Sequence, residues 1–308
     1  MAAAAALLTG TFIYANTNVL SADRICHGWV TPDQVSDALG GGWGRVSASE
    51  DSPTTCSARL ESWLPGQGGE LLNLYLGKEA AGFPFKDRAW EVSGTRHVMT
   101  GGTHGAYSTG GGWALLPPAC SATASDDDSQ TVLHAAVTRG DSAGDSAGMG
   151  RLLASAAQAL TSGPQGCASG TSQTTPTRYL APTAPDDTDF DKVCGIPGFR
   201  LGKVTGPEGQ KVQEQTSGSL KDGLYCDLTF EGDEDGPFAQ LAVVNDSRFV
   251  EPLKNRSFAR ADCDGRETVF ADDMRYREPK EQATTGLPDD ASLAKTFSDA
   301  AREALHCN

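Results

Sequence analysis

The sequence predicts an α+β protein, a tandem of two diverged α/β sandwich domains that each hold an antiparallel sheet, helices and two disulfides. Three observations carry this prediction. The eight cysteines lie at intervals of 30, 64 and 47 residues, then 27, then 32, 37 and 44, so two sets of four share a similar layout. Short segments alternate polar and apolar residues between Gly and Pro, which is typical of hairpin strands. An amphipathic helix closes each half near its last cysteine, and such repetition indicates an internal duplication.

The first 23 residues are an apolar N-terminal segment. Residues 1–15 are almost wholly apolar or small, and no charged residue occurs before Asp23. A secretory signal opens with a basic region, and a membrane-spanning helix needs about 20 apolar residues. The segment has neither feature. We therefore interpret residues 1–23 as a truncated signal or anchor, and we expect the protein to meet the membrane only through it.

The first half opens with a short helix over residues 31–39. Thr31 is suited to cap this helix, Pro32 fits its first turn, and the three glycines at residues 40–42 end it. The second half has the sequence Cys-Gly-Ile-Pro-Gly-Phe at residues 194–199 in the same place. We therefore expect the opening helix to be shortened or absent in the second half.

Paired strands follow in each half. Three pairs of matching segments predict them, namely residues 56–61 and 226–231, 71–76 and 238–244, and 131–137 and 268–271. The first pair alternates polar and apolar side chains and leads through a Gly-rich turn into the second, apolar pair. This pattern predicts antiparallel hairpins in both halves.

The closing helices are amphipathic over three turns. Apolar residues recur at i, i+3 and i+4 from Leu152 to Leu160 in the first half and from Leu293 to Leu305 in the second. Asp289 and Asp290 can cap the second of these helices.

Domain boundaries follow from a change in composition between the halves. Residues 168–189 are rich in Ser, Thr, Pro and Asp, which is typical of a linker. We place the first domain at residues 24–167 and the second at residues 190–308.

This arrangement resembles a known group of proteins. A cysteine followed by a helix that ends in Leu-Gly-Gly, a cysteine in a hairpin strand, and a helix that closes on a final cysteine are similar to the uncharacterised exported proteins of streptomycetes and related actinobacteria. Many of those are lipoproteins or carry one N-terminal anchor, and several have two domains. The resemblance covers nearly the whole chain. It implies an extracytoplasmic location and a compact α/β sandwich, but no reaction and no active-site residues.

All eight cysteines are expected to form structural disulfides. None has the CxxC spacing of a redox centre or zinc site, and an even, dispersed set needs an oxidising compartment. Domain termini commonly lie close together, so we predict the outer pairs Cys26–Cys167 and Cys194–Cys307. The inner pairs would then be Cys56–Cys120 and Cys226–Cys263. A competing map joins the first cysteine of each half to the second, and the third to the fourth.

One motif resembles a catalytic site. The sequence Gly-Asp-Ser-Ala-Gly occurs at residues 140–144 and again at 144–148, between a predicted strand and a predicted helix, as in the nucleophile elbow of α/β-hydrolases. Ser142 or Ser146 would be the nucleophile, and His306 is the only histidine after them. However, the doubled motif is typical of a surface loop, and no oxyanion segment precedes it. We therefore predict no catalytic residue and keep a serine hydrolase as the alternative.

No metal site and no cofactor are predicted. His97 and His104 flank a Gly-rich segment without a nearby pair of carboxylates, and the acidic stretches at residues 126–128 and 231–236 lack the ligand spacing of calcium loops. The chain has 40 acidic and 25 basic residues, and its net charge of −15 would repel nucleic acid and anionic lipid.

The ligand surface is expected in the first half, because all five tryptophans lie there, at positions 29, 43, 63, 90 and 113. The sequence thus predicts an extracytoplasmic protein, anchored to the cell membrane or secreted, with a binding or envelope-structural role and no catalytic activity. Its partner would be an unknown envelope protein or a small ligand.

Overall fold

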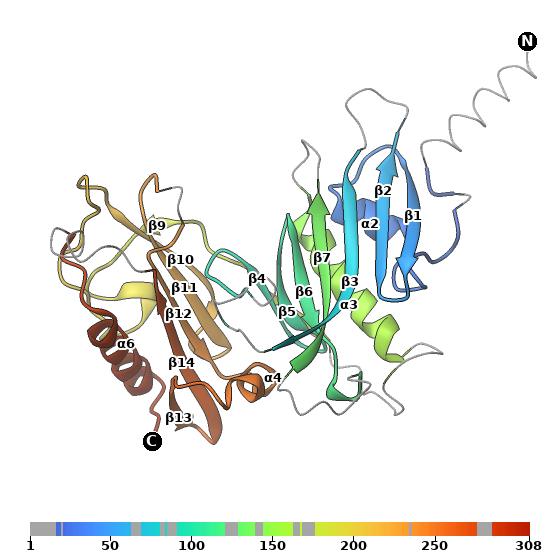
Figure 1. The fold of residues 1–308 in the computed structure, drawn as a ribbon. Coiled ribbons are helices and arrows are strands. Elements are labelled where there is room, and N and C mark those ends of the chain that lie inside the picture. Colours follow the sequence, from blue (N-terminus) through green and yellow to red (C-terminus); the bar gives the residue numbers. More distant parts are fainter. Residues whose placement is uncertain are drawn as a thin grey trace, which may run out of the picture. The chain divides into compact units, whose positions relative to one another are not determined.

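The structure is a computed structural model of the chain, and it describes residues 17–19, 21–62, 69–80, 84, 91–120, 129–138, 144–162, 167, 176–233, 236–275 and 285–308. These residues form two mostly antiparallel sheets and four α-helices, which confirms the α+β class. The chain divides into two compact units (Figure 1). The first unit is Met1–Ala80 with Met99–Tyr179, and the second is Ala81–Val98 with Leu180–Asn308.

The sheet of the first unit has eight strands in the order β1-β2-β3-β7-β6-β5-β4-β8. Their bounds are β1 (Arg45–Ser52), β2 (Thr55–Glu61), β3 (Leu71–Ala80), β4 (His97–Gly101), β5 (His104–Ser108), β6 (Gly111–Leu115), β7 (Ser129–Thr138) and β8 (Thr177–Leu180). The predicted strands at residues 56–61, 71–76 and 131–137 lie inside β2, β3 and β7. The last strand, β8, comes from the stretch that the sequence predicted to be linker.

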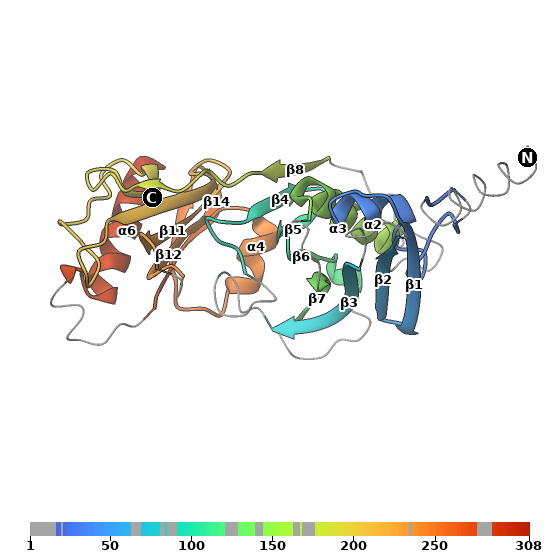
Figure 2. The same cartoon turned by 90° about the horizontal axis from the view of Figure 1, so that it is seen from above.

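Helices α2 (Pro32–Ala38) and α3 (Ser146–Ser162) cover one face of this sheet (Figure 2). Helix α2 begins with a capping box, because the Thr31 hydroxyl accepts from the Gln34 N–H while the Gln34 side chain accepts from the Thr31 N–H. The core lies between helices and sheet. It is built largely from fully buried aliphatic side chains, among them Val35, Leu39, Leu72, Leu74, Leu133, Leu152 and Leu153.

The second unit has six strands in the order β13-β14-β12-β11-β10-β9. Their bounds are β9 (Asp186–Asp187), β10 (Val212–Ser219), β11 (Gly223–Phe230), β12 (Ala239–Val244), β13 (Ala259–Cys263) and β14 (Arg266–Met274). Helix α6 (Asp290–Ala304) packs Leu293, Phe297 and Ala301 against one face, and the Asp289 carboxylate caps it by accepting from the Ser292 N–H. The short helix α4 (Ser247–Val250) follows β12.

Both closing helices and the helix after Thr31 are confirmed. In the second half the single turn η2 (Val193–Gly195) stands where the first half has its opening helix, as predicted. The strand order β1-β2-β3-β7-β6 also matches β10-β11-β12-β14-β13 in chain sequence and in spatial sequence.

The four disulfides join neighbouring cysteines along the chain. They are Cys26–Cys56, Cys120–Cys167, Cys194–Cys226 and Cys263–Cys307, with Cα–Cα distances of 5.3, 4.6, 6.0 and 4.1 Å. No cysteine is free. The predicted pairs Cys26–Cys167, Cys56–Cys120, Cys194–Cys307 and Cys226–Cys263 are therefore wrong, and the competing map is confirmed.

The physical reason lies in the positions of the turns and helix ends. Cys26 and Cys194 stand in turns with left-handed φ angles of 56° and 57°, and these turns present the sulfur to the second long strand, β2 or β11. The closing helix of the second unit ends beside β13, where the Asn308 N–H donates to the Asp262 carbonyl at 2.9 Å. The final cysteine therefore meets the third cysteine rather than the first.

One further prediction concerns the segment at the N-terminal edge of the described residues. Residues 1–16 of the predicted signal or anchor lie outside them. Within the ranges that the structure describes, no helix is both long enough and apolar enough to cross a membrane.

Candidate functional site

A histidine is buried in the middle of strand β7 of the first unit. Its neighbours Leu133 and Ala135 belong to the core beneath the helices, so His134 points to the opposite face of the sheet, because side chains alternate along a strand. His134 lies between Tyr75 on β3 and Trp113 on β6, each directly opposite it in register. We call Tyr75, Glu79, Trp113 and His134 the Tyr75 cluster.

The side chains of Tyr75, His134 and Glu79 lie in close contact. The rings of Tyr75 and His134 lie 4.5 Å apart between centroids at an angle of 18°. Gly77 has no side chain, so the imidazole can lean along β3 until its Nε2 atom lies 2.7 Å from Oε1 of Glu79. The glycine thus permits an approach that any larger residue at position 77 would hinder, because an added Cβ would lie 3.3 Å from that oxygen.

Burial sets the charge of the cluster. It lowers the pKa of His134 to about 4, so the imidazole is neutral at physiological pH. Nε2 lies 2.7 Å from the Glu79 carboxylate without a well-aligned hydrogen bond. Burial and the Glu79 charge both raise the pKa of the Tyr75 hydroxyl, which therefore stays protonated. The cluster accordingly presents a neutral aromatic stack next to one negative charge.

The cluster is open to solvent on one side. Tyr75 is 38% exposed, whereas His134 is 4% and Trp113 1% exposed. The Glu79 side chain is 22% exposed. Tyr75 and Glu79 can therefore touch a ligand, while the buried His134 ring stacks on Tyr75 and the buried Trp113 lies opposite His134 on β6.

The second unit lacks these side chains at the matching positions. In each sheet the disulfide-bonded cysteine of the second long strand pairs with a leucine, Cys56 with Leu74 and Cys226 with Leu241. The next residues along the third strand are Tyr75 and Ala242, and they pair with His134 and Ala271 respectively. Two alanines therefore occupy the positions of Tyr75 and His134 in the second sheet, and the buried Tyr225 pairs with Ala242 from β11.

The hydrolase motif has a structural role where it is described. Asp145 caps α3, its carboxylate oxygens accepting from the N–H groups of Ala147 at 3.1 Å and Gly148 at 3.0 Å. Ser146 is the first residue of this helix, in the first unit, whereas His306 follows α6 in the second unit. A Cβ at Gly148 would lie 2.6 Å from the Asp37 backbone, so this glycine lets α3 approach α2. Ser142 lies outside the described residues.

Of the other candidates from the sequence, Trp113 belongs to the cluster, whereas His97 and His104 lie on other strands. His97 begins β4 and His104 begins β5. In the described part of the chain no group of three or more His, Cys, Asp or Glu residues could hold a metal ion. Of the tryptophans, Trp29 and Trp113 are buried and Trp43 is 57% exposed, while positions 63 and 90 lie outside the described residues, as do the acidic residues 126–128.

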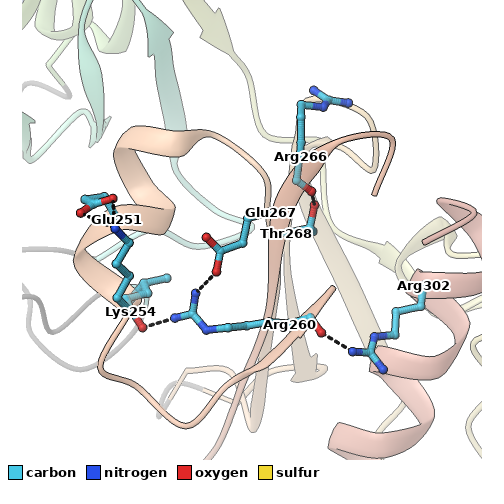
Figure 3. A network of polar contacts seen from close by, with 8 residues as sticks. Glu251, Lys254, Arg260, Arg266, Glu267, Thr268 and Arg302 are labelled. Atoms are coloured by element: carbon cyan, nitrogen blue, oxygen red, sulfur yellow. Dashed lines mark hydrogen bonds and ion pairs between the residues drawn. The ribbon is translucent and has the colours of Figure 1, made fainter. Parts of the chain in front are cut away.

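A basic cluster in the second unit stabilises the fold (Figure 3). The Arg260 guanidinium lies 2.7 Å from the Glu267 carboxylate and also donates to the Leu253 carbonyl. Arg302 of α6 donates to the Arg260 carbonyl, and Lys254 lies 2.7 Å from Glu251. The described contacts of Arg260 and Lys254 pair their charges within the unit, so we assign this cluster to holding β13 against α6 and the turn at Leu253.

The sequence singled out Trp113, but it did not predict that the four residues of the Tyr75 cluster lie together. The available signals were a histidine within an apolar strand and the alternation of Tyr75, Gly77 and Glu79 along one face of β3. Comparison with models of protein families, with curated proteins and with solved structures finds no match for this chain.

Proposed function

We propose that this protein is an extracytoplasmic binding protein without catalytic activity, and that the Tyr75 cluster is its ligand site. The observation that carries the proposal is the row across β3 and β7. It holds Tyr75 and His134 in the first unit but Ala242 and Ala271 in the second. Burying a neutral histidine beside a carboxylate is unfavourable for stability, so a role in binding is a reason for the first unit to keep it.

An oxidising compartment is consistent with the cysteine chemistry. All eight cysteines are in disulfides, which form and persist outside the cytoplasm. No thiol is left to serve as a nucleophile or metal ligand. Attachment through the apolar residues 1–23 completes the proposal, and it is in line with the resemblance to anchored actinobacterial proteins.

We also infer that the two units are diverged copies of one α+β domain. Five strands follow the same order in both, and both copies place one disulfide between the opening turn and the second strand. Each copy places its other disulfide at the end of the closing helix. Under this inference, side chains present in one copy and replaced by alanine in the other are the residues to test for function.

The chemistry of the cluster fits a ligand that carries a compact positive group, such as an ammonium or guanidinium group. The outer face of Tyr75 offers the electron-rich surface of an aromatic ring, and the Glu79 carboxylate supplies a negative charge beside it. His134 is neutral and therefore does not repel a cation. The net charge of −15 also favours a positive ligand over an anionic one.

The test is a titration of the full chain with tetramethylammonium chloride, with sodium chloride at the same ionic strength as the reference. The ring resonances of His134, followed by NMR, should shift in a saturable way. Tyr75→Ala should abolish the shift, and Glu79→Gln should weaken binding at least fivefold. Tyr179→Ala is the matched control, because Tyr179 belongs to the same unit and is 44% exposed. Unshifted His134 resonances, or equal binding by Tyr75→Ala, would refute the ligand site.

A further inference from the structure

A segment that leads into β4, and includes its first two residues, is built into the second unit. Residues Ala81–Val98 belong to that unit, although strands of the first unit precede and follow them in the sequence. Within this segment Val92 and Ser93 are buried. Gly94 crosses the sheet so closely that an added Cβ would lie 2.0 Å from the Gln215 carbonyl oxygen on β10 and 2.7 Å from the Asp227 nitrogen on β11. Position 94 therefore requires glycine.

The segment is held by a buried carboxyl group. Asp227 is 2% exposed and lies between the core residues Cys226 and Leu228, so its side chain points to the face of the sheet away from α6. Its carboxylate accepts hydrogen bonds from the Gly94 N–H and the Ser93 hydroxyl. It also accepts from the Gln240 Nε2 at 3.2 Å. Two of its three donors thus come from the segment.

We propose that residues 91–96 form a strap that docks on the Asp227 carboxyl group of the second unit, and that protonation of this carboxyl group controls how tightly the strap is held. The strap is a ligand supplied by the chain itself: a turn at residues 93–96, closed by the Arg96 N–H donating to the Ser93 carbonyl, that lies on a polar row of the sheet. Val92 contributes a buried apolar side chain, and Ser93 and Gly94 supply the hydroxyl and backbone donors that meet the carboxyl group.

The first unit shows that the fold does not need an acid at this place. Ser57 follows Cys56 on β2 as Asp227 follows Cys226 on β11. Ser57 pairs with Asn73 in register and donates to its Oδ1 atom at 2.9 Å, whereas Asp227 pairs with Gln240. The first unit therefore fills this row with a short neutral pair. The carboxyl group is specific to the copy that holds the strap.

The direction of the pH effect follows from the surroundings of Asp227. The pKa of Asp227 is raised to about 6, mainly by burial and in smaller part by the Glu91 carboxylate, against the opposing effect of the three donors. Glu91 is itself paired with Arg96 at 2.6 Å, and Asp273 lies opposite Gln240 in the next strand. When the strap leaves, the carboxyl group meets water and its pKa falls towards its ordinary value of 3.8. At a pH between these two pKa values, Asp227 takes up a proton when the strap docks. The strap is therefore held more tightly at pH 5 than at pH 7.5.

Hydrogen exchange of the full chain, followed by mass spectrometry on peptides that cover residues 91–98, tests the proposal. Exchange times are scaled for the intrinsic effect of pH on amide exchange. The protection factor of the strap should fall about tenfold from pH 5.0 to pH 7.5, as linkage between these two pKa values requires. Equal protection at both pH values would overturn the proposal.

Variants separate the docking of the strap on Asp227 from general effects of charge. Asp227→Asn should remove the pH dependence of strap protection. Asp264→Asn, the same change at an exposed turn between β13 and β14, should leave it intact. Ser93→Ala removes one donor without introducing bulk, so it should lower strap protection even if Asp227→Asn does not fold. Unchanged protection in Ser93→Ala, or an unchanged pH dependence in a folded Asp227→Asn protein, would contradict the proposal.

Discussion

Gly150 of helix α3 lies directly against the aromatic ring of Tyr107 on strand β5. A Cβ added at Gly150 would lie 2.6 Å from Cζ of that ring and 2.8 Å from its hydroxyl oxygen. Tyr107 is 2% exposed and belongs to the core of the first unit, so it has little room to move away. The glycine is therefore required by packing, although a glycine inside a helix is unfavourable for helix formation.

Gly150→Ala should destabilise the first unit despite its better helix propensity. Alanine favours a helix by about 1 kcal/mol over glycine, but overpacking a tight core costs roughly 1–3 kcal/mol. We expect a net loss of about 1 kcal/mol in the free energy of unfolding, measured by urea denaturation. Gly110→Ala is the control, because Gly110 is exposed and its nearest atom to an added Cβ is 3.9 Å away. A Gly150→Ala protein as stable as the wild type would show that the Tyr107 ring can move aside, and would contradict the prediction.

The helices and most of the strands were predictable because their signals are local. The apolar spacing from Leu293 to Leu305 and the cap at Asp289 define α6 without knowledge of the rest of the chain. Strands β2, β3 and β7 follow in the same way from alternation and apolar runs.

The site could not be predicted because it depends on pairing between distant segments. Tyr75, Trp113 and His134 lie on three strands, and only their register brings them into one row. A shift of one residue would turn His134 into the core. The docking of the strap could not be predicted for the same reason. Gly94 and Asp227 are far apart in sequence, and no residue near Gly94 indicates that Asp227 is its partner.

Non-reducing peptide mapping should recover the four disulfides Cys26–Cys56, Cys120–Cys167, Cys194–Cys226 and Cys263–Cys307 from protein made in an oxidising compartment. Replacing the pair Cys26 and Cys56 by alanine should lower the stability of the first unit by roughly 2–4 kcal/mol, because the 30-residue loop between them is no longer closed in the unfolded chain. The corresponding pair in the second unit, Cys194 and Cys226, encloses 32 residues and should give a similar loss there. A linked peptide that joins Cys26 to Cys167 would contradict the pairing.

Acid should destabilise the first unit through His134. The pKa of His134 is about 4 in the folded unit, below the ordinary value of 6.5 that it regains on unfolding. A depressed pKa means that the unfolded chain binds the proton first, so the contribution is intact above pH 6.5 and is lost as the pH falls towards 4. The size of this loss is at most about 3.5 kcal/mol, because one pKa unit corresponds to about 1.4 kcal/mol. His134→Gln keeps a polar side chain that cannot be protonated, so the difference in unfolding free energy between variant and wild type should change across this range. Urea denaturation from pH 7 to pH 4 measures this difference, with His104→Gln on strand β5 of the same sheet as the control. A difference that stays constant with pH would mean that His134 does not titrate below its ordinary range.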